Sequence, residues 1–152
     1  MAVKPIPDGY HSVTPYLAVR NAAAALEFYK KAFGAEELLR MPAPDGKIAH
    51  AEIRIGDSIV MLADEHPDMD FVGPQTRGGA TSTLMIYVED VDARFKSAID
   101  AGATVTRPLK DEFYGDRAGS LRDPFGHVWL IATHKEDVTP EQMEERMKAA
   151  RP

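Results

Sequence analysis

Residues 14–34 read TPYLAVRNAAAALEFYKKAFG, and residues 83–102 repeat their pattern as TLMIYVEDVDARFKSAIDAG. In both stretches a short apolar segment of strand type leads into an amphipathic helix that ends at a glycine, Gly34 or Gly102. An alternating run, a glycine turn and a last apolar strand follow each helix. This repeat predicts an α+β fold of two tandem βαβββ modules, forming an open, mixed but mainly antiparallel, barrel-like sheet with its helices outside. The cleft between the modules is where function is to be sought.

Turn and capping signals indicate where the modules begin and end. Asn21 is placed to cap a helix over residues 22–33, and the first strand is expected over about 11–19. Thr139 and Gln142 have the spacing of a capping box at the start of a helix. At 152 residues the chain fits a single domain. We expect module one over about 11–64, a connector over about 65–80, module two over about 81–135 and a C-terminal helix over about 139–150.

Charge and composition narrow the classes of partner. The net charge is -6, and the 24 acidic and 18 basic residues are interspersed, which disfavours binding to nucleic acid or to anionic membranes. The chain has no cysteine, no apolar run long enough to span a bilayer and no basic-then-apolar leader. We therefore expect a soluble, cytoplasmic protein that uses neither disulfide nor thiolate chemistry.

Several motifs resemble those of a known protein family. They are YLAV (16–19), EFYKKAFGA (27–35), VEDVD (88–92), AGA (101–103) and DPFGHVW (123–129). They resemble the vicinal oxygen chelate superfamily, which contains glyoxalases, bleomycin-resistance proteins and extradiol dioxygenases, and within it the PhnB-like branch. The resemblance implies paired modules that form an open barrel around a ligand cavity. It also implies that two modules complete each cavity and that the protein is a homodimer.

The resemblance further implies where metal-dependent members of the superfamily hold their ion, usually with His or Glu. These positions fall here on Thr14, Val60, Thr83 and Leu130. Hydroxyl and aliphatic side chains do not replace imidazole and carboxylate as ligands of a divalent ion. We therefore predict no metal and no other cofactor, and we assign these four residues to the lining of a ligand cavity. A divalent ion held by other residues is the alternative.

His50 and Glu52 are the candidate catalytic residues. They stand two apart on a predicted strand and therefore share one face with Arg54, whereas the apolar residues between them take the helix-packed face. If the shared face lines the cleft, the pair forms a general base with its orienting carboxylate, or two metal ligands in need of a third. The alternative is a solvated strand face on which the two side chains share a structural hydrogen bond.

Aromatic and basic side chains complete the candidate ligand site. Those that share the strand faces of the two threonines are Tyr16, Met85 and Tyr87. Tyr114 and Arg117 flank a short glycine turn, where a ring beside a guanidinium would recognise a planar or anionic ligand. The alternative is a turn stabilised by a salt bridge between Asp116 and Arg117, with Tyr114 packed at its rim.

These patterns favour a small-molecule-binding protein that sequesters or senses an aromatic or largely apolar compound without metal. An enzyme of the same superfamily, a lyase, isomerase or dioxygenase that uses His50 and Glu52, is the main alternative. A structural dimer with no ligand of its own is the third. The expected partners are a small molecule and a second copy of the chain.

Overall fold

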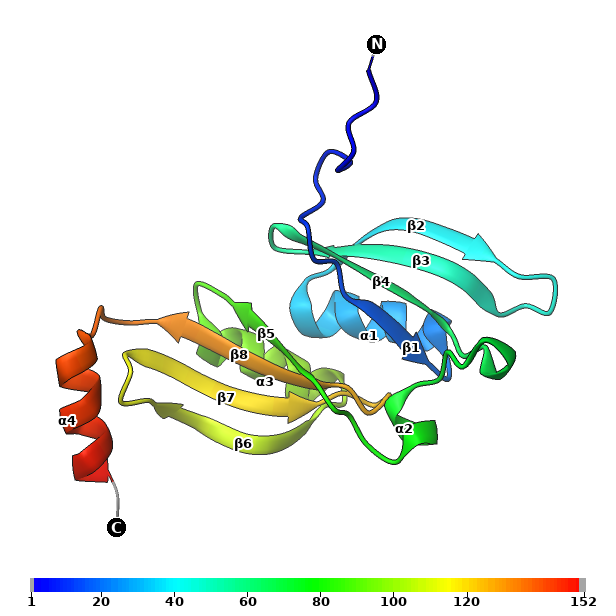
Figure 1. The fold of residues 1–152 in the computed structure, drawn as a ribbon. Coiled ribbons are helices and arrows are strands. Elements are labelled where there is room, and N and C mark those ends of the chain that lie inside the picture. The colour runs from blue at the N-terminus through cyan, green and yellow to red at the C-terminus, as the bar shows by residue number, and fades with distance from the viewer. Residues whose placement is uncertain (1, 151–152) are drawn as a thin grey trace.

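The computed structural model describes residues 2–150, which form two four-stranded sheets, the helices that pack on them and a C-terminal helix (Figure 1). Module one comprises β1 (Tyr16–Val19), α1 (Ala22–Phe33), β2 (Glu36–Pro42), β3 (Ile48–Ile55) and β4 (Ser58–Asp64). Module two comprises β5 (Thr83–Tyr87), α3 (Val91–Ala101), β6 (Thr104–Asp111), β7 (Asp116–Arg122) and β8 (Val128–His134). The remaining elements are the 3₁₀ turn η1 (Pro67–Met69), the one-turn helix α2 (Pro74–Arg77) and α4 (Pro140–Ala150).

Both sheets have the same topology. The strand order is β1-β4-β3-β2 in one sheet and β5-β8-β7-β6 in the other. Strand β1 runs parallel to its neighbour β4, and β5 runs parallel to its neighbour β8. The other neighbours are antiparallel. Tyr16 lies opposite Met61, and Met85 lies opposite Leu130. The predicted α+β fold of two βαβββ modules is confirmed, and the two sheets are not closed into a barrel.

Helix α1 forms where its capping signals predicted it. The Asn21 side chain accepts a hydrogen bond from the Ala24 backbone N–H at 3.1 Å. Gly34 ends the helix with a φ of 66°, a left-handed conformation that costs glycine little. Leu26 and Tyr29, on the inner face of the helix, are fully buried. The helix therefore covers one face of its sheet and leaves the other face without a helix (Figure 1).

The two modules are joined through their helices. Ser97 Oγ of α3 donates to the backbone carbonyl of Ala32 in α1 at 2.9 Å. Across the same junction the rings of Phe33 and Trp129 lie 4.7 Å apart between centroids. Such an aromatic pair contributes about 0.5–1.5 kcal/mol beyond the burial of its surface. The two helices thus pack on each other at the junction, and the faces of the two sheets that carry no helix are left uncovered.

We call these helix-free faces the open faces. The open face of module one carries Tyr16, His50, Glu52 and Met61. The open face of module two carries Met85, Tyr87, Asp116 and Leu130. Alternate strand residues, among them Ala51 and Ile53, belong instead to the apolar core beneath the helices, as the alternating sequence predicted.

The first strand is shorter than predicted. It begins at Tyr16, and the preceding residues back to about 11 are irregular rather than extended in the sheet. Pro15 has no N–H to give to a neighbouring strand, although its carbonyl accepts from the Met61 N–H at 2.9 Å. The Thr14 hydroxyl turns back toward the carbonyl of His11 at 3.5 Å. A local turn therefore replaces the expected strand start.

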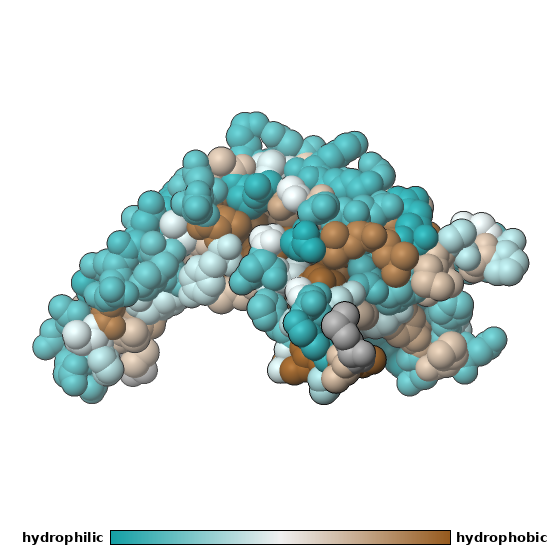
Figure 2. All heavy atoms as spheres, turned by 90° about the horizontal axis from the view of Figure 1, so that it is seen from above, coloured by the Kyte–Doolittle hydropathy of each residue, from teal (hydrophilic) through white to brown (hydrophobic). Residues whose placement is uncertain are grey.

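Helix α4 begins with the predicted capping box. The Thr139 N–H donates to Gln142 Oε1 at 3.0 Å, and the Gln142 N–H donates to Thr139 Oγ1 at 3.2 Å. None of its residues is buried, and it projects from the end of module two that is farther from module one (Figure 1). Seen from above, the molecule is bowed, with apolar side chains gathered among polar ones along its middle (Figure 2). Within residues 2–150 no helix is both long and apolar enough to cross a membrane.

Candidate functional site

The open face of module one carries a chain of hydrogen bonds centred on His50. Its Nδ1 lies 2.6 Å from the Tyr16 hydroxyl, and its Nε2 lies 2.7 Å from Glu52 Oε2. Strands β1 and β3 supply these three side chains, and β4 lies between the two strands. The predicted pairing of His50 with Glu52 is therefore present, and Tyr16 is joined to it.

The protons of this chain can be assigned from charge. Burial raises the pKa of Glu52, but hydrogen bonds from Tyr10 and His50 outweigh burial, so the pKa of this carboxyl lies below its usual value. An ionised carboxylate only accepts, so His50 Nε2 carries the proton that points to Glu52. In neutral imidazole Nδ1 is then an acceptor, and the Tyr16 hydroxyl donates to it. Both ring nitrogens of His50 are thus engaged.

Two segments outside the strands close around this chain. Tyr10, in the N-terminal arm, donates its hydroxyl proton to Glu52 Oε1. Phe71, in the connector, packs its ring edge against Tyr16 with 5.3 Å between centroids. The Tyr16 side chain nevertheless keeps 45% of its surface exposed. Burial and the charge of Glu52 raise the pKa of Tyr16, so its hydroxyl holds its proton at neutral pH.

The open face of module two carries a second polar cluster, centred on Asp116. The Tyr87 hydroxyl donates to Asp116 Oδ2 at 2.8 Å, and His134 Nδ1 lies 2.7 Å from Asp116 Oδ1. His134 Nε2 also lies 2.8 Å from Asp137, so the ring bridges two carboxylates. Hydrogen bonds to Asp137 and to Asp116 raise the pKa of His134. Asp116 itself is only 3% exposed.

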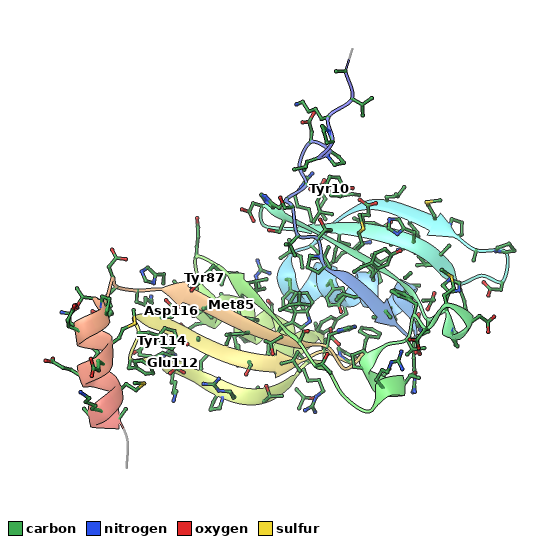
Figure 3. The ribbon with its side chains drawn as sticks, viewed as in Figure 1. Tyr10, Met85, Tyr87, Glu112, Tyr114 and Asp116 are labelled. Atoms are coloured by element: carbon green, nitrogen blue, oxygen red, sulfur yellow. The ribbon has the colours of Figure 1, made fainter. Side chains whose placement is uncertain are left out.

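Tyr114 belongs to the same face as this cluster. Figure 3 shows Tyr114 near Met85, Tyr87 and Asp116, with Glu112 beside it. Burial, together with the charges of Glu112 and Asp116, raises the pKa of Tyr114. Tyr87, Tyr114, Asp116 and Glu112 therefore lie close together at one end of module two.

Arg117 does not join Tyr114. It follows Asp116 on strand β7, so its side chain lies on the opposite face. There its guanidinium donates two hydrogen bonds to Asp92 of α3, at 2.9 and 3.0 Å, and lies 3.4 Å from Asp111. Asp116 pairs with His134 rather than with Arg117. Arg117 therefore ties α3 to its sheet.

The four positions at which metal-dependent relatives hold their ion do not form a ligand set here. Thr14 contacts a backbone carbonyl, and Thr83 is exposed at the start of β5. Val60 belongs to the apolar core with 5% of its surface exposed, while Leu130 lies beside Met85 on the open face. Across residues 2–150 no three or more side chains of the metal-binding types gather in a way that could hold an ion. The donors that a divalent ion requires are thus missing from these positions.

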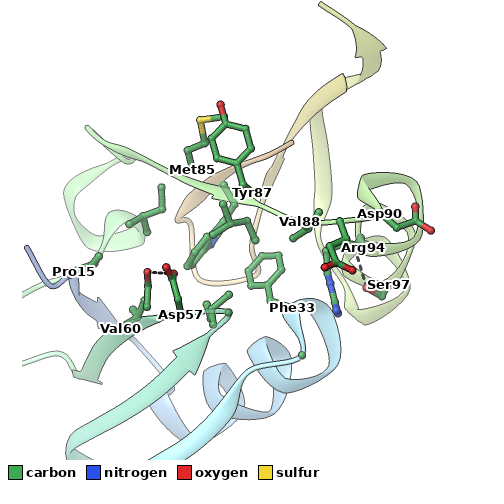
Figure 4. Close-up of a pocket in the computed structure, with 18 of the residues that line it drawn as sticks. Pro15, Phe33, Asp57, Val60, Met85, Tyr87, Val88, Asp90, Arg94 and Ser97 are labelled. Atoms are coloured by element: carbon green, nitrogen blue, oxygen red, sulfur yellow. Dashed lines mark hydrogen bonds between the residues drawn. The ribbon is translucent and has the colours of Figure 1, made fainter. Parts of the chain in front are cut away.

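A cavity of about 1130 Å³ lies at the junction of the modules. It is bounded by β5, by the start of α3 and by the turn between β3 and β4 (Figure 4). Its walls are mainly apolar, with Phe33, Val60 and Trp129 among them, and Arg94 and Asp90 add charge at the α3 side. The volume slightly exceeds the roughly 300–1,000 Å³ of typical small-molecule sites. This cavity and the two open faces are the candidate sites for a ligand.

Sequence reasoning missed several of these contacts. Asp116 and Tyr87 are 29 positions apart, and Tyr10 and Glu52 are 42 apart, so no local spacing connects them. His134 ends strand β8, and its neighbours in the sequence give no sign of a site. The burial of Asp116 follows from the pairing of β7 with β8, so the sequence alone carries no sign of it.

Comparison with known proteins identifies the family. The family model of the Glyoxalase/Bleomycin resistance protein/Dioxygenase superfamily matches residues 9–131, which include both βαβββ modules up to β8. The chain belongs to this superfamily.

Three relatives illustrate the range of similarity. The uncharacterized protein Mb0911c of Mycobacterium bovis is 43% identical over 141 residues, which cover 91% of this chain and 93% of that protein. The structure of TioX from Micromonospora sp. ML1 is similar with a TM-score of 0.65 and 31% identity, over 82% of this chain and 98% of TioX. TnmS3, an antibiotic binding protein from Streptomyces sp. CB03234, shares the fold with a TM-score of 0.62 and 20% identity, over 89% and 99% of the two chains.

Proposed function

We propose that this protein is a metal-free, small-molecule-binding member of its superfamily that sequesters or senses an aromatic or largely apolar compound. The observation that carries the proposal is the state of His50. Both of its ring nitrogens are held, by Tyr16 and by Glu52, at hydrogen-bond distances of 2.6 and 2.7 Å. A metal ion, or a substrate that gave its proton directly to His50, would first have to displace one of these partners.

The exposed side chains of the two open faces favour apolar ligands. Tyr16 and Met85 are 45% and 41% exposed on the open faces, and Tyr87 is 62% exposed. The cavity between the modules adds mainly apolar walls. Large exposed apolar side chains that gather on one surface mark binding sites in soluble proteins. TnmS3 is described as an antibiotic binding protein, and its likeness to this chain supports only a fold suited to such binding.

The second candidate function is catalysis by an enzyme of the superfamily, a lyase, isomerase or dioxygenase. The geometry that favours it is the continuous chain from Tyr16 through His50 to Glu52. In this chain a proton taken up at the Tyr16 oxygen could pass to His50 while Glu52 stabilises the imidazolium. Under the binding proposal a bound ligand is released unchanged, whereas under this second proposal it is converted to product.

The proposed assembly is a homodimer of the PhnB-like type, working in the cytoplasm. Each open face leaves large side chains uncovered, with Leu39 and Met41 of β2, at 41% and 50% exposure, opposite Glu52 and His50 of β3. A second copy that placed its module two against module one would cover both faces and enclose a ligand between them. The net charge of -6 argues against nucleic acid as a partner.

A ligand screen tests the proposal. Wild-type protein would be titrated with a panel of uncharged and charged aromatic compounds, with thermal shift as the first readout and calorimetry as the second. We expect at least one compound to raise the melting temperature in proportion to its concentration and to be recovered unchanged. A compound that is converted to product in the presence of the protein would favour the enzyme. No shift with any aromatic compound would contradict the proposal.

A further inference from the structure

Three tyrosine hydroxyls around the open faces have their protons committed to the protein. Tyr10 donates to Glu52 and Tyr87 donates to Asp116. Tyr16 lies 2.6 Å from His50 Nδ1 and donates to it in the tautomer assigned from the ionised Glu52. A hydroxyl has one proton and two lone pairs. Once the proton is engaged inside the protein, the oxygen offers only acceptor sites to a ligand.

The charge behind these tyrosines is negative. Glu52 and Asp116 are 8% and 3% exposed, and their hydrogen-bond partners are tyrosines and histidines. Among residues 2–150 no Lys or Arg lies within ion-pair distance of either carboxylate. Arg54, next to Glu52 on its strand face, pairs with Glu36 at 3.1 Å instead. The two carboxylates are therefore compensated only by imidazoles.

The basic side chains of module two do not cancel this charge on the open face. Arg117 lies on the opposite face, against Asp92. Arg107 and Lys110 approach Glu112 at 3.5 and 3.8 Å and partly neutralise that carboxylate, but not Asp116. A positive group on a ligand would be attracted to both open faces, and a carboxylate would be repelled.

The rings of the tyrosines also favour a positively charged ligand. Tyr16 and Tyr87 expose 45% and 62% of their surface on the open faces. The π-face of a tyrosine attracts cations, and donation of its hydroxyl proton to an acceptor makes the ring richer in electrons. An acceptor oxygen and an electron-rich ring thus lie together at each of the two tyrosines.

We propose that the open faces select a ligand whose planar apolar body carries a protonated amine or amidine, with its N–H groups donating to the oxygens of Tyr16 and Tyr87. This inference rests on the proposed binding function and names its ligand class. The negative charges of Glu52 and Asp116, which lie beneath the tyrosines, attract the cation, and these two carboxylates need not touch the ligand.

Three planar probes with one ring system test this inference. 9-Aminoacridine is a cation with N–H donors, acridine is neutral slightly above neutral pH, and acridine-9-carboxylate is an anion. Binding to the full-length protein would be measured by fluorescence titration at low salt. We expect 9-aminoacridine to bind roughly tenfold more tightly than acridine, and the carboxylate to bind more weakly than acridine.

Two single variants link the preference to the tyrosines. Tyr16→Phe and Tyr87→Phe keep the ring and remove only the oxygen. We expect each to reduce the affinity for 9-aminoacridine severalfold and to change the affinity for acridine by less than about twofold. Thr106→Val, which removes an exposed hydroxyl from β6, serves as the matched control and should change neither.

The outcomes separate this inference from the binding proposal. Equal affinity for the three probes would overturn the inference while the binding function stands. The same holds if Tyr16→Phe and Tyr87→Phe leave the relative affinities for the three probes unchanged. Preference for the carboxylate would overturn it as well. If none of the three acridines binds at millimolar concentration, the aromatic-binding proposal fails together with the inference.

Discussion

Tyr29 in α1 and Asp123 in the turn before β8 join the two modules by a buried hydrogen bond of 2.6 Å, across 94 positions of sequence. The same carboxylate accepts from Trp129 Nε1 at 2.9 Å and from the backbone N–H groups of Phe125 and His127. A single aspartate thus organises the DPFG turn, the β8 tryptophan and the contact between the modules. Burial of Tyr29, together with the charge of Asp123, raises the pKa of the Tyr29 hydroxyl, so this hydroxyl stays protonated.

Removing this carboxylate should destabilise the whole domain. Asp123→Ala leaves the buried Tyr29 hydroxyl and the Trp129 N–H without an acceptor, so we expect a loss of about 3–5 kcal/mol in the free energy of unfolding. Tyr29→Phe leaves the other bonds to Asp123 in place and should cost about 1–2 kcal/mol. Urea unfolding measures both. Asp100→Asn, which breaks only the exposed pair with Lys96, is the control, and an Asp123→Ala midpoint equal to that of the control would refute this role.

His134 should make stability depend on pH in mildly acidic to neutral solution. Its pKa in the folded protein is raised by Asp137 and Asp116, so protonation favours the folded state. This contribution is fully present below the unfolded pKa, about 6.5, and is lost as the pH rises through the folded pKa. The difference in unfolding midpoint between wild type and His134→Gln should therefore be largest in mild acid and shrink at alkaline pH. An NMR titration that places the pKa of His134 at or below its ordinary value would contradict the prediction.

Glu52 should show the opposite dependence on pH. Its folded pKa is lowered because the hydrogen bonds from Tyr10 and His50 outweigh burial. Ionised Glu52 therefore stabilises the fold above the unfolded pKa of about 4.5, and this stability disappears as the pH falls through the folded pKa. Glu52→Gln should be less stable than wild type at neutral pH and nearly equal to it in strong acid. Melting curves over that range provide the measurement, and a stability difference that persists unchanged in acid would argue against an ionised Glu52.

The pair His50 and Glu52 distinguishes binding from catalysis. His50→Ala combined with Glu52→Ala removes both side chains that the enzyme alternative requires and leaves the apolar side chains of the open faces in place. We expect the double variant to bind an identified aromatic ligand more weakly, by roughly tenfold or less, because only polar contacts and the support of Tyr16 are lost. Titration calorimetry measures this change. If a substrate is found, loss of all turnover in the double variant would assign catalysis to this pair, and full retained activity would show that catalysis lies elsewhere.

Local sequence patterns predicted most of the fold. The period of two in β3 placed His50 and Glu52 on one face, where they do form a hydrogen bond. The cap at Asn21 and the glycine at Gly34 set the ends of α1 as expected. These features depend on neighbours within a few positions, which is why the sequence alone could specify them. The predicted start of β1 at about residue 11 was wrong, because Pro15 lacks the N–H that a continuing strand would use.

The site depends on relations that local patterns do not carry. The parallel register of β1 and β4 places Met61 opposite Tyr16, so Val60 belongs to the core face, where it also borders the cavity between the modules. The pairing of Asp116 with His134 depends on how β7 and β8 align. Arg117 is held by Asp92 because α3 lies over its strand face. Each of these relations is set by packing between elements.

Metal content tests the central claim most directly. Protein purified without an affinity tag or chelator would be analysed by elemental mass spectrometry and then melted with Mg²⁺, Mn²⁺, Fe²⁺, Ni²⁺ and Zn²⁺ in turn. A metal-free binding protein predicts far less than one ion per chain and no increase in melting temperature with any of these ions. Near-stoichiometric metal, with a rise in melting temperature that His50→Ala removes, would contradict the account and favour a metal-dependent enzyme.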